Sequence, residues 1–227
     1  MSTLYIVATP IGNLDDFSPR AAEVLNSVSY IACEDTRNSG VLLNRYGIDT
    51  PTFSFHQHNE HQKVEHLIQL LDANQPVALI SDAGMPGISD PGFLAVRAAH
   101  QQGHTVSVIP GPDAATTALV ASGLPCDRYV YEGFLPHKKG RQKQLKQLVD
   151  EDRTIVFYES PYRVVKLLEE LVEYFDENQW AAVCRELTKK FEEVVRGRLK
   201  DLLGEFGSRS ELKGEFVIVL APKGYDE

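Results

Sequence analysis

Short runs of apolar residues alternate with longer amphipathic stretches along the first half of the chain. Residues 77–80 read Val-Ala-Leu-Ile, which is typical of a buried strand, whereas apolar residues at Val64, Leu67 and Leu71 repeat at the spacing of a helix face. This alternation predicts a mostly parallel sheet with helices on its faces. The predicted strands are residues 4–8, 30–33, 52–55, 77–80 and 105–109, and the predicted helices begin near Ser18, Asp35, Val64, Asp90 and Ala114.

The same alternation resumes in the second half of the chain, after a break at residues 123–127 that reads Gly-Leu-Pro-Cys-Asp. This break is the expected domain boundary, so we predict two domains, residues 1–122 and 123–227. The predicted strands of the second domain are residues 129–134, 154–158, 181–185, 192–196 and 214–221, and its predicted helices are residues 143–149, 160–175 and 199–206.

The segment after the fourth predicted strand, residues 81–92, is the most unusual loop of the chain. It holds three Gly, two Pro and two Asp residues, whereas most strand-to-helix connections need only about two to six residues. Asp90 and Pro91 suit the N-cap and the first position of the following helix. An elaborate connection without a ligand is the alternative, but a loop that exposes its backbone between a strand and a helix is typical of a small-molecule site.

Three loops with Gly or Pro each follow an apolar strand, at residues 9–13, 81–92 and 110–113. In a parallel sheet the carboxyl ends of these strands lie at one edge. We therefore expect the loops to converge there and to form a pocket lined by backbone N–H and C=O groups. Such a pocket would hold a polar ligand with few side chains.

The overall charge argues against a general nucleic-acid-binding protein. The formal net charge of the 227 residues is −9, yet residues 137–143, with Lys146, form a local basic segment. Such a segment is usually a solvated helix face, but its place after a predicted strand favours contact with phosphate groups. No apolar run approaches the roughly 18 residues of a membrane span. The N-terminus resembles no signal peptide and the three Cys residues are expected to be reduced, so we expect a cytoplasmic protein.

Several familiar motifs are absent or ambiguous. The patterns Gly-x-Gly-x-x-Gly after the first strand, Gly-x4-Gly-Lys-Ser/Thr and Gly-x-Ser-x-Gly do not occur, which disfavours a nicotinamide enzyme, a nucleoside triphosphatase and a serine hydrolase. His56 and His58 invite a metal site, but no second cluster at ligand spacing supports one, and we expect no metal. The alternative is a polar connection in which His56 contacts substrate. Asp35 and Arg37 are either a helix cap and a surface residue or members of the crevice.

Seven short motifs stand in a characteristic order along nearly the whole chain, and the loop at residues 81–92 together with residues 185–189 is the most specific combination. The motifs are Thr-Pro-Ile-Gly-Asn-Leu at residues 9–14, Glu-Asp-Thr-Arg at 34–37, the loop at 81–92, Pro-Gly-Pro at 110–112, Gly-Phe-Leu-Pro at 133–136, Glu-Ser-Pro-Tyr-Arg at 159–163 and Arg-Glu-Leu-Thr-Lys at 185–189. In these motifs the chain resembles the tetrapyrrole methylase-like (class III) S-adenosylmethionine-dependent methyltransferases.

The resemblance implies two α/β domains in a homodimer, with a mostly parallel N-terminal sheet, a mixed C-terminal sheet and the active cleft between the domains. It also implies S-adenosylmethionine as the methyl donor. The chain is most similar to members that methylate the ribose 2′-oxygen of a decoding-centre cytidine in 16S rRNA, presented in the small ribosomal subunit. By family position the donor site comprises Pro10, Ser81, Asp82, Ala83, Gly84, Asp113 and Ala114 from the first domain and Tyr158, Glu159, Arg185, Glu186, Gly214 and Glu215 from the second.

The implied reaction needs little chemistry from the protein. A sulfonium donor is already activated, so the protein mainly aligns an in-line displacement, and a ribose hydroxyl benefits from a base within hydrogen-bond reach. The candidate bases are Glu34, Asp35 and Glu159, and the candidate phosphate contacts are Arg37, Lys138, Lys139 and Arg163.

The chain departs from the pattern of the family at a few positions. Met85, Asp113 and Tyr162 stand where the family usually has Thr, a small Ser and His, and the chain ends at Glu227 where many relatives carry a further segment. Two alternative functions remain open: a methylase of the same family that acts on a tetrapyrrole such as precorrin or on a protein side chain, and a non-catalytic ligand-binding α/β protein.

Overall fold

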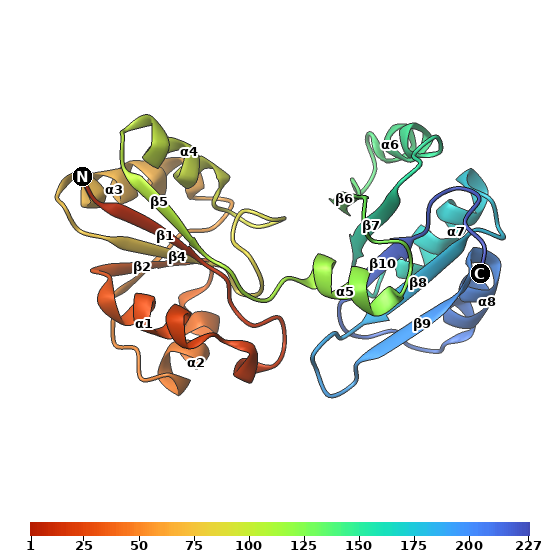
Figure 1. Cartoon of the computed structure of the whole chain (residues 1–227), viewed down its shortest axis with the longest axis horizontal. Helices are drawn as coiled ribbons and strands as arrows, with labels where there is room; N and C mark the ends of the chain where they lie inside the picture. Colours follow the sequence, from red (N-terminus) through yellow and green to blue (C-terminus); the bar gives the residue numbers. More distant parts are fainter. The chain divides into compact units, whose positions relative to one another are not determined.

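The chain forms two compact units, Met1–Asp113 and Ala114–Glu227, in a computed structural model that describes residues 1–227 (Figure 1). The division lies one helix earlier than the boundary that we expected after residue 122. Helix α5 (Ala114–Ser122) belongs to the second unit because it packs against strands of the second sheet. Most of its residues are Ala, Thr, Leu or Val, so no polar stripe in the sequence marks the face that it buries.

The first unit is built on a sheet of five parallel strands in the order β3-β2-β4-β1-β5, which confirms the predicted parallel sheet. Its strands are β1 (Thr3–Val7), β2 (Tyr30–Cys33), β3 (Thr52–Ser54), β4 (Val77–Ile80) and β5 (Thr105–Ile109). Its helices are α1 (Pro19–Ser27), α2 (Thr36–Arg45), α3 (Glu60–Asp72) and α4 (Phe93–Gln101), with a short 3₁₀ helix at Leu14–Asp16.

Helices cover both faces of this sheet. Leu25 of α1 and Leu42 of α2 pack on one face against Ile80, while α3 and α4 pack on the other face around Leu67 and Leu79 (Figure 1). Such two-sided burial explains why β4, at the centre of the sheet, is apolar at every position rather than at alternate ones.

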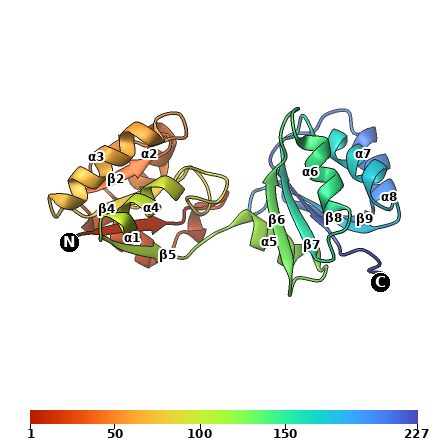
Figure 2. The same cartoon turned by 90° about the horizontal axis from the view of Figure 1, so that it is seen from above.

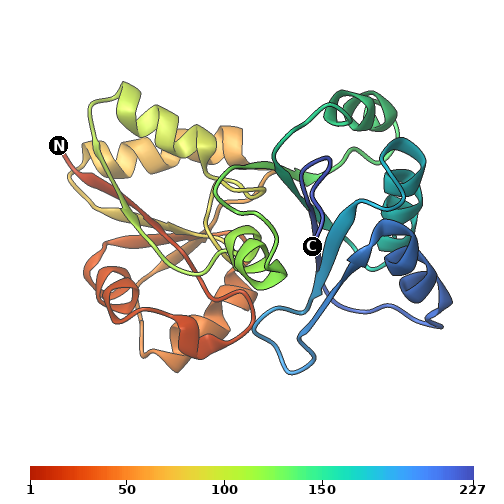
Figure 3. The same cartoon turned by 45° about the vertical axis from the view of Figure 1, so that its right-hand side comes forward.

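The second unit contains a mixed sheet in the order β6-β7-β10-β8-β9, where β6 and β7 are parallel and the other pairs are antiparallel. The mixed sheet was expected. Helices α6, α7 and α8 pack on one of its faces (Figure 2), and the segment that joins β8 to β9 forms a long hairpin loop (Figure 3). The elements are β6 (Tyr129–Phe134), α6 (Arg141–Leu148), β7 (Thr154–Glu159), α7 (Val164–Tyr174), β8 (Trp180–Arg185), β9 (Glu193–Arg198), α8 (Leu199–Ser208) and β10 (Phe216–Leu220).

Two helices begin later than their sequence signals indicated. Helix α4 does not start at an Asp90 cap, because its N-cap is Gly92 at φ +146°. Helix α7 starts at Val164 rather than after Ser160, since residues 160–163 first form a turn in which the Ser160 carbonyl accepts from two N–H groups. None of the helices of the chain combines the length and the apolar character that crossing a bilayer requires.

Candidate functional site

The three Gly- and Pro-containing loops of the first unit meet at one edge of its sheet, as predicted. Strand β1 lies between β4 and β5 and runs parallel to both. Beyond the strands, Thr9 and Gly84 exchange two backbone hydrogen bonds of 2.9 and 3.0 Å. A Cβ added to Gly111 would lie 2.9 Å from the Cβ of Ala8, so this loop also passes very close to the end of β1. We refer to residues 9–13, 81–92 and 110–113 as the loop edge.

Polar side chains inside the loop edge hold its backbone in place. The buried Ser81 hydroxyl lies 3.2 Å from the Ala83 carbonyl and 3.3 Å from the Gly84 carbonyl, and the Thr9 hydroxyl donates to the Ser81 carbonyl at 3.1 Å. Gly84 adopts φ +78°, a conformation that L side chains rarely adopt. The loop shape is therefore fixed by the chain itself, without a ligand.

A small cavity opens on the side of the loop edge that faces α2. Its volume is about 150 Å³, less than the roughly 300–1,000 Å³ of typical small-molecule sites. It can therefore hold one part of a larger ligand, and the rest of such a ligand would lie over the exposed loops. The cavity is lined by Thr9, Pro10, Leu14, Asn38, Ser39, Val41, Leu42, Ile80, Ser81 and Asp82.

Carboxylates surround this part of the loop edge. One Asp82 oxygen accepts from the Asp35 N–H at 3.1 Å and the other from the Asn38 amide at 2.8 Å, while the Asp82 N–H lies 3.5 Å from a Glu34 oxygen. Burial, and next the negative charges of Asp82 and Asp35, raise the pKa of Glu34 above its usual value. Neighbouring negative charge favours a ligand with a positive group.

Asp35 is a helix cap, the simpler of the two interpretations that its sequence allowed. Its carboxylate accepts from the Arg37 N–H at 2.8 Å and from the Arg37 side chain at 2.7 and 3.1 Å. The hydrogen bonds from Arg37 lower the pKa of Asp35 to about 2. Such a carboxylate is a weak base, so the hypothesis that Asp35 is the catalytic base gains no support.

Asp90, which was expected only to cap a helix, has an environment that sequence reasoning missed. Burial and the charge of Glu34 raise the pKa of Asp90 to about 7. The capping task falls instead to Glu60 of α3, whose Oε1 accepts from the Gly92 N–H at 3.0 Å and the Leu94 N–H at 3.3 Å. A cap that comes from another helix leaves no local sequence signal.

The predicted site residues of the second unit also lie at one edge of a sheet. Phe216 at the start of β10 pairs with Glu159 at the end of β7 and with Arg185 at the end of β8. Beyond Arg185, Glu186 receives the Glu215 N–H at 3.0 Å and lies 2.9 Å from Lys189. A Cβ at Gly214 would collide with the Glu186 side chain, so the close approach of these two residues requires glycine at position 214.

Glu159 does not meet solvent. Its side chain has no exposed surface, and one oxygen accepts from the Ser160 N–H at 2.8 Å and forms an ion pair with Arg163, also at 2.8 Å. An enclosed carboxylate that is bound to a guanidinium does not reach a substrate hydroxyl, so the burial speaks against Glu159 as the catalytic base.

The remaining predicted residues have diverse surroundings. Lys138 and Lys139 are exposed in the loop before α6, while the Tyr158 ring packs edge-on against Phe134 and Tyr131. His56 lies 3.2 Å from the Asn59 amide, next to the His58 ring. No group of three or more His, Cys, Asp or Glu side chains in residues 1–227 is arranged to hold a metal ion.

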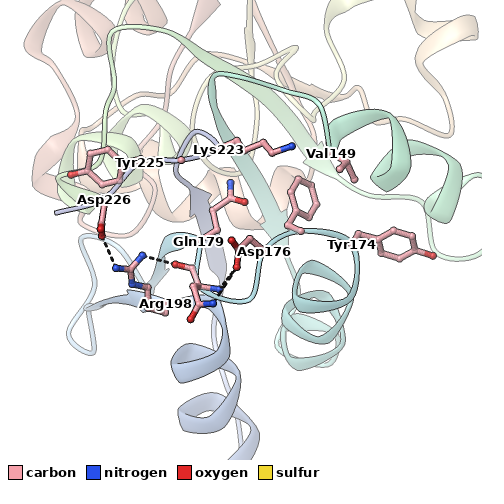
Figure 4. Close-up of a pocket in the computed structure, with 11 residues that line it drawn as sticks. Val149, Tyr174, Asp176, Gln179, Arg198, Lys223, Tyr225 and Asp226 are labelled. Atoms are coloured by element: carbon pink, nitrogen blue, oxygen red, sulfur yellow. Dashed lines mark hydrogen bonds and ion pairs between the residues drawn. The ribbon is translucent and has the colours of Figure 1, made fainter.

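A larger cavity of about 410 Å³ lies at the opposite edge of the second sheet, and no predicted site residue lines it (Figure 4). Arg198 is its most basic feature, but this guanidinium already donates to Asp226 at 2.5 Å and to the Asn178 carbonyl at 2.6 Å. With its charge balanced and its donors occupied, Arg198 offers little to an anionic ligand, so this cavity is not the candidate site.

Known proteins match the chain over nearly its whole length. It is 48% identical to the "Ribosomal RNA small subunit methyltransferase I" of Escherichia coli O157:H7 over 96% of this chain and 77% of that protein. It is 41% identical to the protein of the same name from Thermotoga maritima, over 98% of this chain and 100% of that protein.

Solved structures of lower sequence identity share the fold. The crystal structure of the methyltransferase CobJ superposes with a TM-score of 0.74 at 17% identity, over 100% of this chain and 97% of that one. The uroporphyrin-III-C-methyltransferase from Thermus thermophilus gives 0.69 at 21% identity, over 97% and 94%. The family described as Tetrapyrrole (Corrin/Porphyrin) Methylases matches residues 3–203. With that match and these relatives, the chain belongs to the tetrapyrrole methylase family.

Proposed function

We propose that this chain is an S-adenosylmethionine-dependent methyltransferase of small-subunit rRNA, and that its acceptor is the ribose 2′-oxygen of a decoding-centre cytidine in 16S rRNA. The near full-length similarity to proteins named ribosomal RNA small subunit methyltransferase I carries the choice of rRNA. The motif at residues 34–37 and the basic segment with Lys146 favour this acceptor over a tetrapyrrole or a protein side chain, and the finer choice of a ribose oxygen follows the resemblance of the motifs.

The loop edge suits S-adenosylmethionine as donor. This molecule has a positive sulfonium and a positive amino group, and Glu34 and Asp82 supply negative charge beside the cavity. Pro10, Ser81 and Asp82 line that cavity, and the backbone of residues 83 and 84 continues the same surface. When bound, the donor would supply an activated methyl group, so the protein's task is alignment. Asp113, Ala114, Tyr158, Arg185, Glu186 and Gly214 complete the proposed donor site.

Among the three candidate bases, Glu34 fits the task best. A general base works best when its pKa lies near the operating pH, and the pKa of Glu34 is raised while that of Asp35 is lowered. Glu159 is enclosed. We therefore assign to Glu34 the removal of the proton from the ribose hydroxyl.

The RNA contacts proposed for this chain are basic, and three of them are exposed. Lys138 and Lys139 lie in an exposed loop, and the Arg37 side chain is 88% exposed although it is paired with Asp35. Arg163 and His56 complete the proposed set. We further propose that the protein acts in the cytoplasm, as a homodimer, on RNA within the small ribosomal subunit.

Methyl transfer to purified small subunits tests the proposal. Subunits from cells that lack this enzyme are incubated with the protein and labelled S-adenosylmethionine, and the labelled position is mapped. We expect one methyl group on a ribose 2′-oxygen of 16S rRNA, and none on precorrin offered as an alternative acceptor. Label on precorrin alone, or binding of the donor without transfer to any acceptor, would overturn it.

A further inference from the structure

Four charged side chains form a largely buried cluster in the second unit. Arg141, the first residue of α6, is only 3% exposed although it lies in the basic segment of the sequence. Its guanidinium lies 2.7 Å from Glu170 of α7 and 3.5 Å from Glu159. Glu159 in turn lies 2.8 Å from Arg163. The two arginines and two glutamates balance in charge.

The cluster connects two surface segments, each of which contains a proposed RNA contact: the loop with Lys138 and Lys139, and the turn at residues 160–163 with Arg163. On one side, Arg141 donates to the Pro136 carbonyl at 3.3 Å and so closes the loop that contains Lys138 and Lys139. On the other side, Glu159 accepts from the Ser160 N–H and pairs with Arg163, and these two contacts close the turn that displays Tyr162. Tyr162 is 93% exposed. Arg141 and Glu159 therefore join the two segments through the interior.

The two oxygens of Glu159 have different partners, and this difference couples the turn to Arg141. One oxygen accepts from the Ser160 N–H and forms the ion pair with Arg163, whereas the other is buried and accepts no hydrogen bond. That second oxygen faces Arg141 at 3.5 Å, so the charge of Arg141 is its main compensation. A buried carboxylate left without such compensation is strongly unfavourable, which ties the position of Glu159 to that of Arg141.

We propose that Arg141 and Glu159 are positioning residues that hold the Lys138–Lys139 loop and the Tyr162 turn at a fixed spacing for a single strand of RNA. The lysines would contact phosphate groups and the Tyr162 ring would stack on a base, the two interactions that single-strand binding commonly combines. Neither Arg141 nor Glu159 touches RNA in this scheme. This inference rests on the proposed function, and it assigns to Glu159 a role other than catalysis.

Charge balance predicts how substitutions should combine. Arg141→Met leaves one excess negative charge in the cluster, and Glu159→Gln leaves one excess positive charge. The double variant removes one of each and restores neutrality with side chains of similar volume, so it should fold at least as well as either single variant. Lys166→Met is the matched control, because it removes a positive charge from an exposed position of α7 outside the cluster.

Kinetics with small subunits and hydrogen exchange test the inference together. For Arg141→Met, Glu159→Gln and the double variant we expect KM for the subunit to rise by about tenfold. We expect kcat and the Kd of S-adenosylmethionine to stay near the wild-type values. Amides of residues 137–140 and 160–163 should exchange faster in the same variants, and Lys166→Met should change neither quantity. The KM effects should not add in the double variant, since both substitutions break one connection.

Two outcomes would overturn the inference. If Glu159→Gln abolishes kcat at unchanged KM while Arg141→Met is silent, Glu159 acts in the chemistry. If neither variant changes exchange at residues 137–140, the cluster does not hold that loop. Failure of the wild-type protein to methylate small subunits would instead reject the proposed function, and the exchange measurement would still decide whether Arg141 and Glu159 position the two segments.

Discussion

Glu34 and Asp35 are adjacent carboxylates with opposite environments, and the proposed chemistry needs only one of them. We expect Glu34→Gln to lower kcat by about 10²- to 10⁴-fold because it removes the base, whereas binding of S-adenosylmethionine should weaken far less because Asp82 still supplies negative charge beside the cavity. Asp35→Asn is the matched control, since it removes the same charge from the next residue and Asn still caps a helix. Single-turnover rates of methyl transfer, measured for both variants, should fall much further for Glu34→Gln than for Asp35→Asn. Equal losses in the two would show that local charge matters and proton transfer does not.

Asp90 should make the stability of the chain depend on pH. The pKa of its carboxyl is about 7 in the folded chain against 3.8 for an ordinary Asp. Between these values the folded state binds more protons than the unfolded state, so its stability falls as pH rises from about 4 to 7 and stays lower above. The neighbouring groups that act on Asp90 are Glu34, Asp82 and Ser81.

The substitution Asp90→Asn should remove this penalty. The shift of about three pKa units sets an upper limit of about 4 kcal/mol on the gain in unfolding free energy at pH 8. At pH 4 the variant and the wild type should differ little, because the carboxyl is then largely protonated in the folded chain. Urea unfolding at the two pH values measures the difference. If the unfolding free energies of the variant and the wild type change by the same amount between pH 4 and pH 8, the raised pKa of Asp90 is refuted.

At the scale of elements, Glu60 links α3 to the start of α4 and to the loop edge. Glu60→Ala removes the acceptor of the Gly92 and Leu94 N–H groups. We expect a loss of about 1 kcal/mol in unfolding free energy, as for the removal of other helix caps, and faster exchange of those two amides. Glu65→Ala, at an exposed position of the same helix, is the control. Unchanged exchange at residues 92 and 94 would contradict the assignment.

The crossing of the 110–113 loop over the end of β1 requires the small residues Gly111 and Ala8. Gly111→Ala would bring two Cβ atoms to 2.9 Å, so we expect a loss of about 1–3 kcal/mol and weaker binding of S-adenosylmethionine. Ala8→Gly in the same chain removes one of the two atoms and should restore binding. Calorimetric measurement of the Kd of S-adenosylmethionine for the single and double variants tests this expectation. A double variant that binds no better than Gly111→Ala would exclude this contact as the cause.

The elements that sequence predicted best are those whose signals are local. Residues 30–33, 77–80 and 105–109 are strands with the predicted bounds, and the helix expected near Ser18 begins with Ser18 as its cap. The start of α4 was wrong because its cap comes from Glu60, a residue distant in sequence. The convergence of the three loops could be predicted because they follow strands of a parallel sheet. The burial of Glu159 could not be predicted, because it depends on its pairing with Arg141 and on the pairing of Arg141 with Glu170, and no local sequence pattern indicates these pairs.

For the whole molecule, sequence indicated two units and missed where they divide. Each unit has its own buried core: one face of the second sheet packs against α6, α7 and α8, and both faces of the first sheet are covered by helices. Residues 123–127 do form a loop between regular elements, as expected. The preceding helix α5, however, is apolar on most sides, so its sequence does not indicate which unit it packs against. Its neighbours, the strands of the second sheet, lie later in sequence, so only tertiary structure assigns it to the second unit.

The net charge of −9 makes binding of RNA depend on a local basic surface, and this dependence can be measured. Removing one lysine that binds a phosphate group should lower the slope of log K against log salt by about 0.7 for a single strand, so Lys138→Ala with Lys139→Ala should lower it by about 1.4. The double variant Lys200→Ala with Lys223→Ala is the matched control. It also removes two positive charges, but at the opposite edge of the second sheet. Because the long-range effect of net charge is screened by salt, the slope should change only in the first pair. Equal changes in both would mean that RNA responds to the overall charge and that the loop before α6 does not bind phosphate groups.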